Sequence, residues 1–188
     1  MNYFVPLLAG FVFSWASAFT GLYSRLLGER GGRTLTSLLR NAIGIPLWIY
    51  GFVLAWMKPS PLYFIPVRWL MITGATLVII GCVPIIWGHL SLGLRSHMPS
   101  IRDTLVRSGL YSFIRHPIYS GLIVCLAGLA LLNPAVAFVR ACALALIWAL
   151  VQARLEEMDL ISRMPGYRQY MDEVPGFIPF LRKRLLKR

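Results

Sequence analysis

The fold is decided by an apolar stretch at residues 118–153, which reads IYSGLIVCLAGLALLNPAVAFVRACALALIWALVQA. Asn133-Pro134 divides this stretch, and the residue before a proline is biased away from helix. The first arm is shorter than the roughly 20 residues that cross a bilayer core. We therefore predict a tight helical hairpin made of residues 118–132 and 135–153, with a re-entrant pair of helices as the alternative.

Three further apolar segments precede the hairpin, at about 3–22, 41–57 and 69–88. Of the 188 residues 57% are hydrophobic and 14% are charged, whereas soluble domains carry roughly 25% charged residues. The mean hydropathy is +0.67. These values exclude a soluble protein and predict an all-α integral membrane protein with about five transmembrane helices.

We predict a single membrane domain, 1–188, with three N-terminal spans in 1–88 and a catalytic half in 89–188. No positive region precedes the first apolar segment, which favours an uncleaved span over a signal peptide. Three cysteines lie within apolar runs, so we expect them to act as small hydrophobic residues rather than as a disulfide or metal framework. They are Cys82, Cys125 and Cys142.

The net charge is +12, and the basic residues gather in alternate loops. Four of the 19 lie in residues 25–40, four in 89–117 and eight after residue 153. Because cytoplasmic loops keep an excess of lysine and arginine, this pattern predicts an N-terminus outside and a C-terminus in the cytoplasm. Nearly all acidic residues lie on the same predicted face, which indicates a cytoplasmic site.

One polar cluster, RSGLYSFIRHPIYSG at residues 107–121, leads directly into the hairpin. Pro117 suits the first turn of a helix, and Gly121 permits close approach of a backbone or a ligand. Arginine and tyrosine are also ordinary anchors at a membrane interface, so a structural role is the alternative.

A second cluster, RLEEMDL at residues 154–160, should continue the last helix into the cytoplasm. Helical spacing places Arg154 beside Glu157 and Met158. It also places four polar residues on another face, and a solvated, self-paired helix surface is the alternative. These residues are Gln152, Glu156, Asp159 and Arg163.

Together the two clusters resemble the isoprenylcysteine carboxyl methyltransferase family and its phospholipid N-methyltransferase relatives. The resemblance rests on R-H-P-x-Y-x-G at 115–121, on E-E-x-x-L at 156–160, and on a tail with Tyr167, Tyr170 and Val174-Pro175. It extends over about residues 92–180, while the first spans are similar only as generic membrane helices.

The resemblance implies that S-adenosyl-L-methionine binds at the cytoplasmic membrane face. Glu156 is suited to its ammonium group, and rings such as Tyr111 to its adenine and ribose. The implied cofactor-binding residues are Asp103, Thr104, Leu105, Val106, Tyr111, His116, Pro117, Ile118, Tyr119 and Glu156.

The predicted catalytic residues are Arg115, Arg154 and Glu157, and no metal is expected. An ionised carboxylate acceptor needs no base, whereas an amine or thiol would use Glu157, Asp159 or His116. Gln152 stands where isoprenylcysteine members have an arginine for the substrate carboxylate, and Arg154 is an imperfect replacement on another side of the helix.

The predicted function is S-adenosylmethionine-dependent methylation of a lipophilic acceptor that enters from the bilayer, with isoprenylcysteine-type carboxyl O-methylation as the first interpretation. Phospholipid amine N-methylation and small-thiol methylation are the alternatives within this class. Outside this class, one alternative is a reductase that uses NADPH, because sterol reductases have a similar R-H-x-N-Y-x-G motif. The last alternative is a non-enzymatic membrane subunit, with Arg115 and Glu156 as a structural ion pair.

The C-terminal tail, residues 177–188, mixes apolar and basic residues. Such a segment beside a membrane favours contact with anionic lipid headgroups over nucleic-acid binding.

Overall fold

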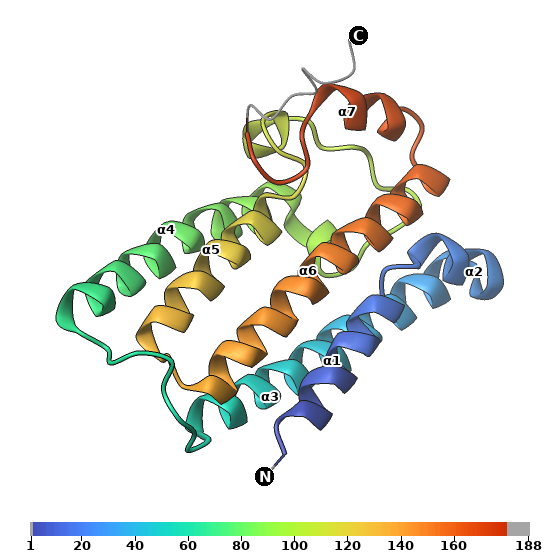
Figure 1. The fold of residues 1–188 in the computed structure, drawn as a ribbon. Coiled ribbons are helices and arrows are strands. Elements are labelled where there is room, and N and C mark those ends of the chain that lie inside the picture. The colour runs from blue at the N-terminus through green and yellow to red at the C-terminus, as the bar shows by residue number, and fades with distance from the viewer. Residues whose placement is uncertain (1, 180–188) are drawn as a thin grey trace, which may run out of the picture.

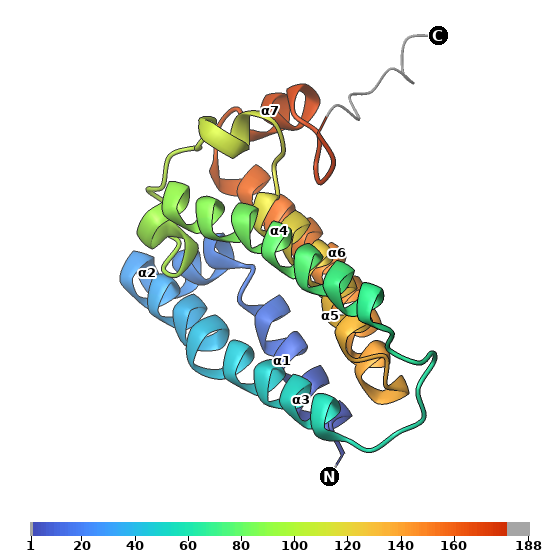
Figure 2. The ribbon, with the colours of Figure 1, turned by 90° about the vertical axis from the view of Figure 1, so that its left-hand side faces the viewer.

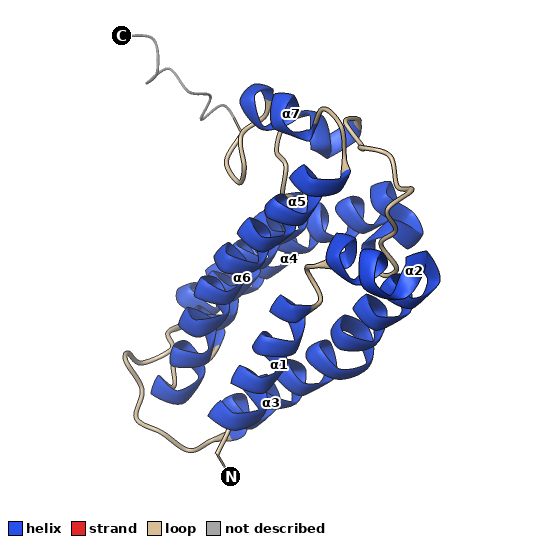
Figure 3. Cartoon of the chain, turned by 90° about the vertical axis from the view of Figure 1, so that its right-hand side faces the viewer, coloured by secondary structure: helices blue, strands red, loops and turns tan. Residues whose placement is uncertain are grey.

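The computed structural model describes residues 2–179 and is built from helices and loops (Figures 1 and 3). The apolar segments form α1 (Phe4–Ala16), α3 (Ile45–Met57), α4 (Arg68–Leu92), α5 (Pro117–Leu132) and α6 (Val136–Arg163). The remaining elements are α2 (Thr20–Ser37), the π-helical turn η1 (Leu38–Gly44), the 3₁₀ turns η2 (Gly93–Ser96) and η3 (Gly109–Ser112), and α7 (Tyr167–Glu173).

Three helical stretches are long and apolar enough to cross a membrane: Thr20–Met57, Arg68–Ser96 and Val136–Arg163. The apolar helices α1 and α5 are shorter. These helices confirm the predicted all-α membrane class. The predicted hairpin is also present, since α5 ends at Leu132 and α6 begins at Val136 on either side of Asn133-Pro134.

Glycines allow α4 and α5 to pack with their backbones almost in contact (Figure 2). A Cβ atom added to Gly81 would lie 2.6 Å from the carbonyl oxygen of Gly121. One added to Gly128 would lie 2.5 Å from the carbonyl oxygen of Gly74. The seven-residue spacing on both helices, two helical turns, repeats the contact along the pair.

A second glycine contact joins α1 to α3. A Cβ atom on Gly51 would lie 2.6 Å from the backbone nitrogen of Leu7, so α1 lies directly against α3. Helix α6 lies between this pair and α5 (Figure 1). Its buried Phe138 and Trp148 pack with Phe11 of α1 in one hydrophobic core, which joins the two helix pairs.

The predicted span 3–22 is wrong as one continuous helix, because α1 ends at Ala16 and α2 begins at Thr20. The hydroxyl of Ser17 donates to the carbonyl oxygen of Ser14 at 2.6 Å, a local hydrogen bond that competes with the helix. Phe19 then has non-helical backbone angles (φ −94°, ψ 51°). Hydropathy alone does not show this break.

Residues 25–40, predicted as a cytoplasmic loop, are helical instead. Gly28 has φ 74°, a left-handed value that glycine adopts readily, and it divides α2 into two helical arms. A Cβ atom on Gly32 would lie 2.4 Å from the backbone nitrogen of Ser24. The two arms are therefore packed closely against each other.

The charged segments meet at one end of the molecule, where α2, residues 93–116, the last turns of α6 and α7 lie together (Figures 1 and 3). Asp159 accepts a hydrogen bond of 2.7 Å from the backbone nitrogen of Gly21. Glu29 forms an ion pair of 2.7 Å with Arg102. The segments that the charge pattern assigned to one face are thus close in space.

We expect Gly81→Leu to destabilise the protein, because its side chain would overlap the backbone of α5 near Gly121. Overpacking of this kind costs about 1–3 kcal/mol. The measurement is the thermal unfolding midpoint in detergent. Ile79→Leu, at an exposed position on the same helix, is the matched control, and a Gly81→Leu protein as stable as this control would contradict the glycine contact.

Candidate active site

A cavity of about 450 Å³ lies at the charged end of the helices, a size typical of small-molecule sites. Pro117 begins α5 without lining the cavity, but the other nine predicted cofactor-binding residues all line it. They are Asp103, Thr104, Leu105, Val106, Tyr111, His116, Ile118, Tyr119 and Glu156.

Glu156 is held in this cavity by three donors. Its Oε1 atom accepts hydrogen bonds from Tyr119 Oη at 2.8 Å and Gln152 Nε2 at 3.0 Å. Arg40 Nη2 is an ion-pair partner at 3.1 Å. The second oxygen, Oε2, has no hydrogen-bond partner within residues 2–179. The carboxylate is therefore positioned with one oxygen available to a ligand.

Arg40 is a cavity residue that sequence reasoning missed. It lies in η1 and donates from Nε to Ser17 Oγ at 3.3 Å and from Nη1 to the carbonyl oxygen of Ser96 at 3.0 Å. With its bond to Glu156, it joins three parts of the chain. Its position at the end of a basic segment indicated only that it contributes to the charge pattern that sets membrane orientation.

The three predicted catalytic residues meet at one carboxylate. Glu157 Oε1 lies 2.8 Å from Arg115 Nη2 and 3.0 Å from His116 Nε2, and its Oε2 lies 3.3 Å from Arg154 Nη1. The Glu157 side chain is 7% exposed, whereas that of Arg154 is 66% exposed. Arg115 lines the cavity, but Glu157 and Arg154 do not.

The ion pair between Arg115 and Glu156 that the non-enzymatic alternative assumed does not form, because Arg115 pairs with Glu157. Adjacent helical residues point about 100° apart, so Glu156 faces Arg40 instead. The predicted helix faces are confirmed: Gln152 donates to Glu156 and Arg163 Nε lies 2.6 Å from Asp159 Oδ2.

The C-terminal segment crosses the R-H-P motif. The backbone nitrogens of Arg115 and His116 donate to the carbonyl oxygens of Pro175 and Gly176 at 2.9 and 3.0 Å. Arg115 Nη1 also donates to the carbonyl oxygens of Met171 and Val174. This segment therefore fixes the loop that lines the cavity. Of the predicted lipid-binding tail, residues 180–188 lie outside the described residues.

Two tyrosines support the same loop. Tyr170 donates from Oη to the carbonyl oxygen of Tyr111 at 2.6 Å. Burial raises the pKa of Tyr170 to about 12, so its hydroxyl stays protonated at neutral pH and remains a donor. Burial also raises the pKa of the Tyr111 phenol.

Within the described part of the chain, His116 uses one ring nitrogen, Nε2, to contact Glu157 and makes no hydrogen bond with the other. Its Nε2 atom lies 3.0 Å from Glu157 Oε1, so a neutral ring donates its proton there. That tautomer leaves a lone pair at Nδ1, for which residues 2–179 supply no hydrogen-bond partner. Because His116 lines the cavity, this arrangement suits a proton acceptor.

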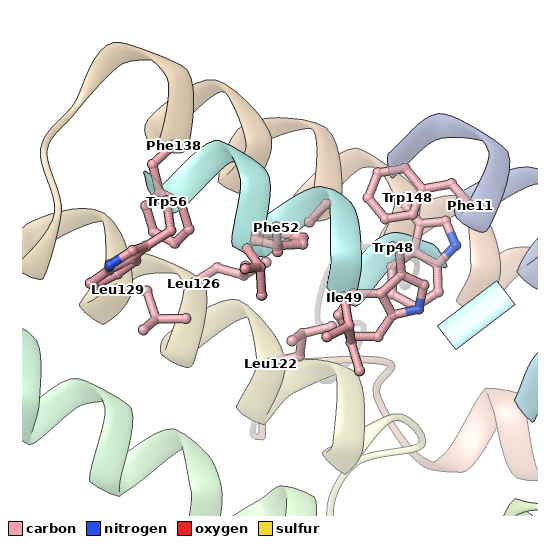
Figure 4. A pocket seen from close by; sticks show the side chains of 12 residues that line it. Phe11, Trp48, Ile49, Phe52, Trp56, Leu122, Leu126, Leu129, Phe138 and Trp148 are labelled. Atoms are coloured by element: carbon pink, nitrogen blue, oxygen red, sulfur yellow. The ribbon is translucent and has the colours of Figure 1, made fainter. Parts of the chain in front are cut away.

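A second cavity of about 340 Å³ forms an apolar groove along the helices (Figure 4). It shares Trp48, Leu122 and Trp148 with the first cavity, so the two adjoin at these residues. The groove is lined by Phe11, Trp48, Ile49, Phe52, Val53, Trp56, Leu122, Leu126, Leu129, Phe138, Ala145 and Trp148. Of these, Ile49, Val53 and Trp56 on α3 are exposed.

The described residues contain no group of three or more His, Cys, Asp or Glu side chains that could hold a metal ion. The three cysteines are free thiols, and the sulfur atoms of Cys82 and Cys125 lie 4.0 Å apart between α4 and α5.

Comparisons with known proteins identify the family. The model of the phospholipid methyltransferase family matches residues 69–166, just over half of the chain. The cobalt-zinc-cadmium resistance protein CzcN of Cupriavidus metallidurans is 32% identical over 154 residues, which cover 77% of this chain and 66% of that protein. No solved structure matches the chain.

The family match runs from α4 through the whole of α6 and includes the loop at 103–119 and Glu156. The matched region therefore includes most of the polar residues that line the larger cavity. It confirms the family predicted from the R-H-P and E-E motifs. This chain belongs to the phospholipid methyltransferase family.

Proposed function

We propose that this membrane protein transfers a methyl group from S-adenosyl-L-methionine to an acceptor that carries a hydrocarbon chain. The observation that carries the proposal is the junction of two cavities, one polar and one lined by apolar side chains, at Trp48, Leu122 and Trp148. A polar cofactor and an apolar chain can thus lie end to end.

The polar cavity fits the methyl donor. The donor's ammonium group suits the free Oε2 of Glu156, since charge-assisted hydrogen bonds are the strong ones. Its adenine suits the apolar surface of Leu105 and Val106, beside Tyr111. When bound, the donor supplies a methyl group on a sulfonium, which is already an activated leaving group.

The protein's own residues then align the methyl donor with the acceptor and exclude water from the site. The bonds to Glu156 hold one end of the cavity, and the contacts of Arg115 hold the 111–116 loop. If the acceptor is an amine or a thiol, His116 Nδ1 takes its proton, while Glu157 stabilises the resulting imidazolium. A carboxylate acceptor would leave this base unused.

The apolar groove supports a lipophilic acceptor. Ile49, Val53 and Trp56 on its α3 side are each nearly half exposed, so a hydrocarbon chain can enter from the bilayer. We place the cavity at the cytoplasmic face, with the N-terminus outside, because the basic segments surround it. The basic tail is proposed to contact anionic headgroups there.

Two acceptor groups fit this arrangement, and one observation separates them. The sequence resemblance favours the carboxylate of an isoprenylcysteine, which needs a cation with free donors. Three of the four arginines that line the cavity are neutralised by an acid: Arg40 by Glu156, Arg115 by Glu157 and Arg163 by Asp159. The fourth, Arg95, donates from Nη1 to the Thr104 carbonyl. This favours the second candidate, the amine of a phospholipid.

Glu156→Gln is expected to lower the affinity for S-adenosylhomocysteine at least tenfold, since it removes a charge-assisted bond of about 1.5–3 kcal/mol. Isothermal titration of the purified protein measures this. Glu173→Gln, which removes an acid paired with Arg107 at the surface, is the control. Absence of binding in the unmodified protein, or saturable NADPH binding in its place, would refute the methyl donor.

Val53→Trp should fill the groove without touching the polar cavity. Membranes that contain this variant are expected to incorporate at least tenfold less label from a radiolabelled methyl donor into extracted lipid, while S-adenosylhomocysteine binds normally. Ile79→Trp, on the exposed face of α4, adds the same bulk elsewhere. Equal incorporation by both variants would show that the groove does not hold the acceptor.

The label in these membranes also identifies the acceptor group. An N-methyl group resists alkali, whereas a methyl ester is hydrolysed to volatile methanol. We expect the label to stay in the lipid after alkaline treatment, because three of the four cavity arginines are already paired with acids. Release of most of the label as methanol would select the carboxylate instead.

A further inference from the structure

Helix α2 lies where the hydrocarbon core of the bilayer ends. The helical stretch that follows it, η1 with 7 residues and α3 with 13, spans about 30 Å, close to the thickness of that core. The two arms of α2, which meet at Gly28, are therefore at the level of the lipid headgroups. They belong to the end of the molecule that carries the polar cavity (Figure 1), which is the cytoplasmic end in the orientation proposed above.

The first arm of α2 has an apolar face that no described part of the chain covers. The side chains of Leu22, Leu26 and Leu27 are 50%, 71% and 57% exposed. Leu22 and Leu26 are four residues apart and share one side of the helix, with Arg25 beside them. A helix with exposed apolar residues next to arginines is typical of segments that lie in the membrane interface.

Three arginines on α2 lack an anionic partner. The side chains of Arg25, Arg30 and Arg33 have no ion pair and no hydrogen bond within residues 2–179. The one acid of α2, Glu29, does not neutralise them, because it pairs with Arg102 at 2.7 Å. These three cations therefore favour an anion that comes from outside the chain.

A phospholipid with a net negative headgroup fits both features of α2. Its phosphate accepts charge-assisted hydrogen bonds from guanidinium groups, and its acyl chains contact the exposed leucines. A soluble polyanion would leave the leucines uncovered, and the cation of a zwitterionic headgroup would be repelled by the arginines. Basic residues beside a membrane strengthen binding to anionic lipids by about fivefold each.

Glu29 connects α2 to the wall of the polar cavity. Its Oε1 atom accepts a hydrogen bond from Ser100 Oγ at 2.9 Å, and its Oε2 atom pairs with Arg102. Ser100 is buried, and Pro99 and Asp103 on either side of it line the cavity. The position of α2 therefore affects the wall that a ligand in the cavity contacts.

We propose that α2 is a binding site for anionic phospholipids, and that a lipid bound there holds the cavity wall at residues 96–104 and so raises the affinity for the methyl donor. The phosphate contacts Arg25, Arg30 and Arg33, and an acyl chain lies along Leu22 and Leu26. The basic tail takes no part in this site. Only the second part of the proposal rests on the proposed function, because it concerns the methyl donor.

Native mass spectrometry of the purified protein in a neutral maltoside detergent tests the lipid site, with dioleoyl phosphatidylglycerol and dioleoyl phosphatidylcholine as probes. The unmodified protein is expected to bind the anionic lipid about tenfold more tightly or better. Arg25→Gln combined with Arg30→Gln should lower this preference about fivefold or more.

The matched control is Arg140→Gln combined with Arg168→Gln, which removes the same charge from exposed positions outside α2. This control should keep the preference for the anionic lipid. An equal loss in both double variants would show that the preference reflects net charge alone and would overturn the site. Equal binding of the two lipids to the unmodified protein would overturn it as well.

A third double variant tests whether the acyl chains take part. Leu22→Ser combined with Leu26→Ser should weaken both lipids by a similar factor, about threefold or more, because the two lipids have the same chains. If these substitutions change nothing, or if polyphosphate displaces phosphatidylglycerol at an equal concentration of charge, the surface binds a soluble anion and the lipid assignment is wrong.

The affinity for S-adenosylhomocysteine, measured in nanodiscs made of either lipid, tests the second part. Phosphatidylglycerol nanodiscs are expected to give binding that is about fivefold tighter or better. Glu29→Ala removes the contacts with Ser100 and Arg102, so it should abolish this difference while the preference for phosphatidylglycerol remains.

The two parts of the proposal fail in different ways. Equal affinity for S-adenosylhomocysteine in both kinds of nanodisc would overturn the effect on the methyl donor and leave the lipid site standing. The same conclusion follows if Glu29→Ala keeps the full difference. If S-adenosylhomocysteine binds in neither lipid, the proposed function fails, and the lipid site is still decided by mass spectrometry.

Discussion

The carboxylate of Glu157 is the interaction on which the candidate site depends. Removing one partner of a buried ion pair is strongly destabilising, about 3–5 kcal/mol, because it leaves an uncompensated charge. Glu157 has Arg115 and His116 from the loop before α5, and Arg154 from its own helix. Through Arg115 it also reaches the C-terminal segment at Met171 and Val174. One buried acid thus fixes three parts of the chain around the cavity.

Glycine packing determines where the apolar groove lies. The backbones of α4 and α5 touch at Gly81 and Gly121, and α1 touches α3 at Gly51, so neither pair leaves space between its members. The remaining space lies where α3, α5 and α6 meet, and large side chains such as Phe52, Leu126 and Phe138 line it without filling it. The groove is therefore a consequence of two tight helix pairs held apart by α6.

Hydropathy and prolines predicted the α5–α6 hairpin correctly, because Asn133-Pro134 is a local signal. The break after Ala16 escaped prediction, since it depends on a serine hydroxyl inside an otherwise apolar run. The segments around His116 and Glu156 were found through their motifs. Arg40 and Trp48 were not, because their role arises only when the N-terminal helices pack against α6, and neither residue belongs to a local pattern that indicates this contact.

The positive charge beside Glu156 comes from the N-terminal half of the chain. Members of the resembled family that act on isoprenylcysteine have an arginine at the position of Gln152. In this chain Arg40 of η1 supplies the ion pair from the other half of the molecule. The position on α6 is thereby left to a neutral amide, whose nitrogen binds Glu156 and whose oxygen has no hydrogen-bond partner among residues 2–179. With the cation supplied by η1, Glu156 is compensated, and Gln152 of α6 contributes no positive charge at the end of the groove. Under the proposed function, Glu156 would remain compensated and able to bind the methyl donor, while the end of the groove would present a neutral amide to the acceptor.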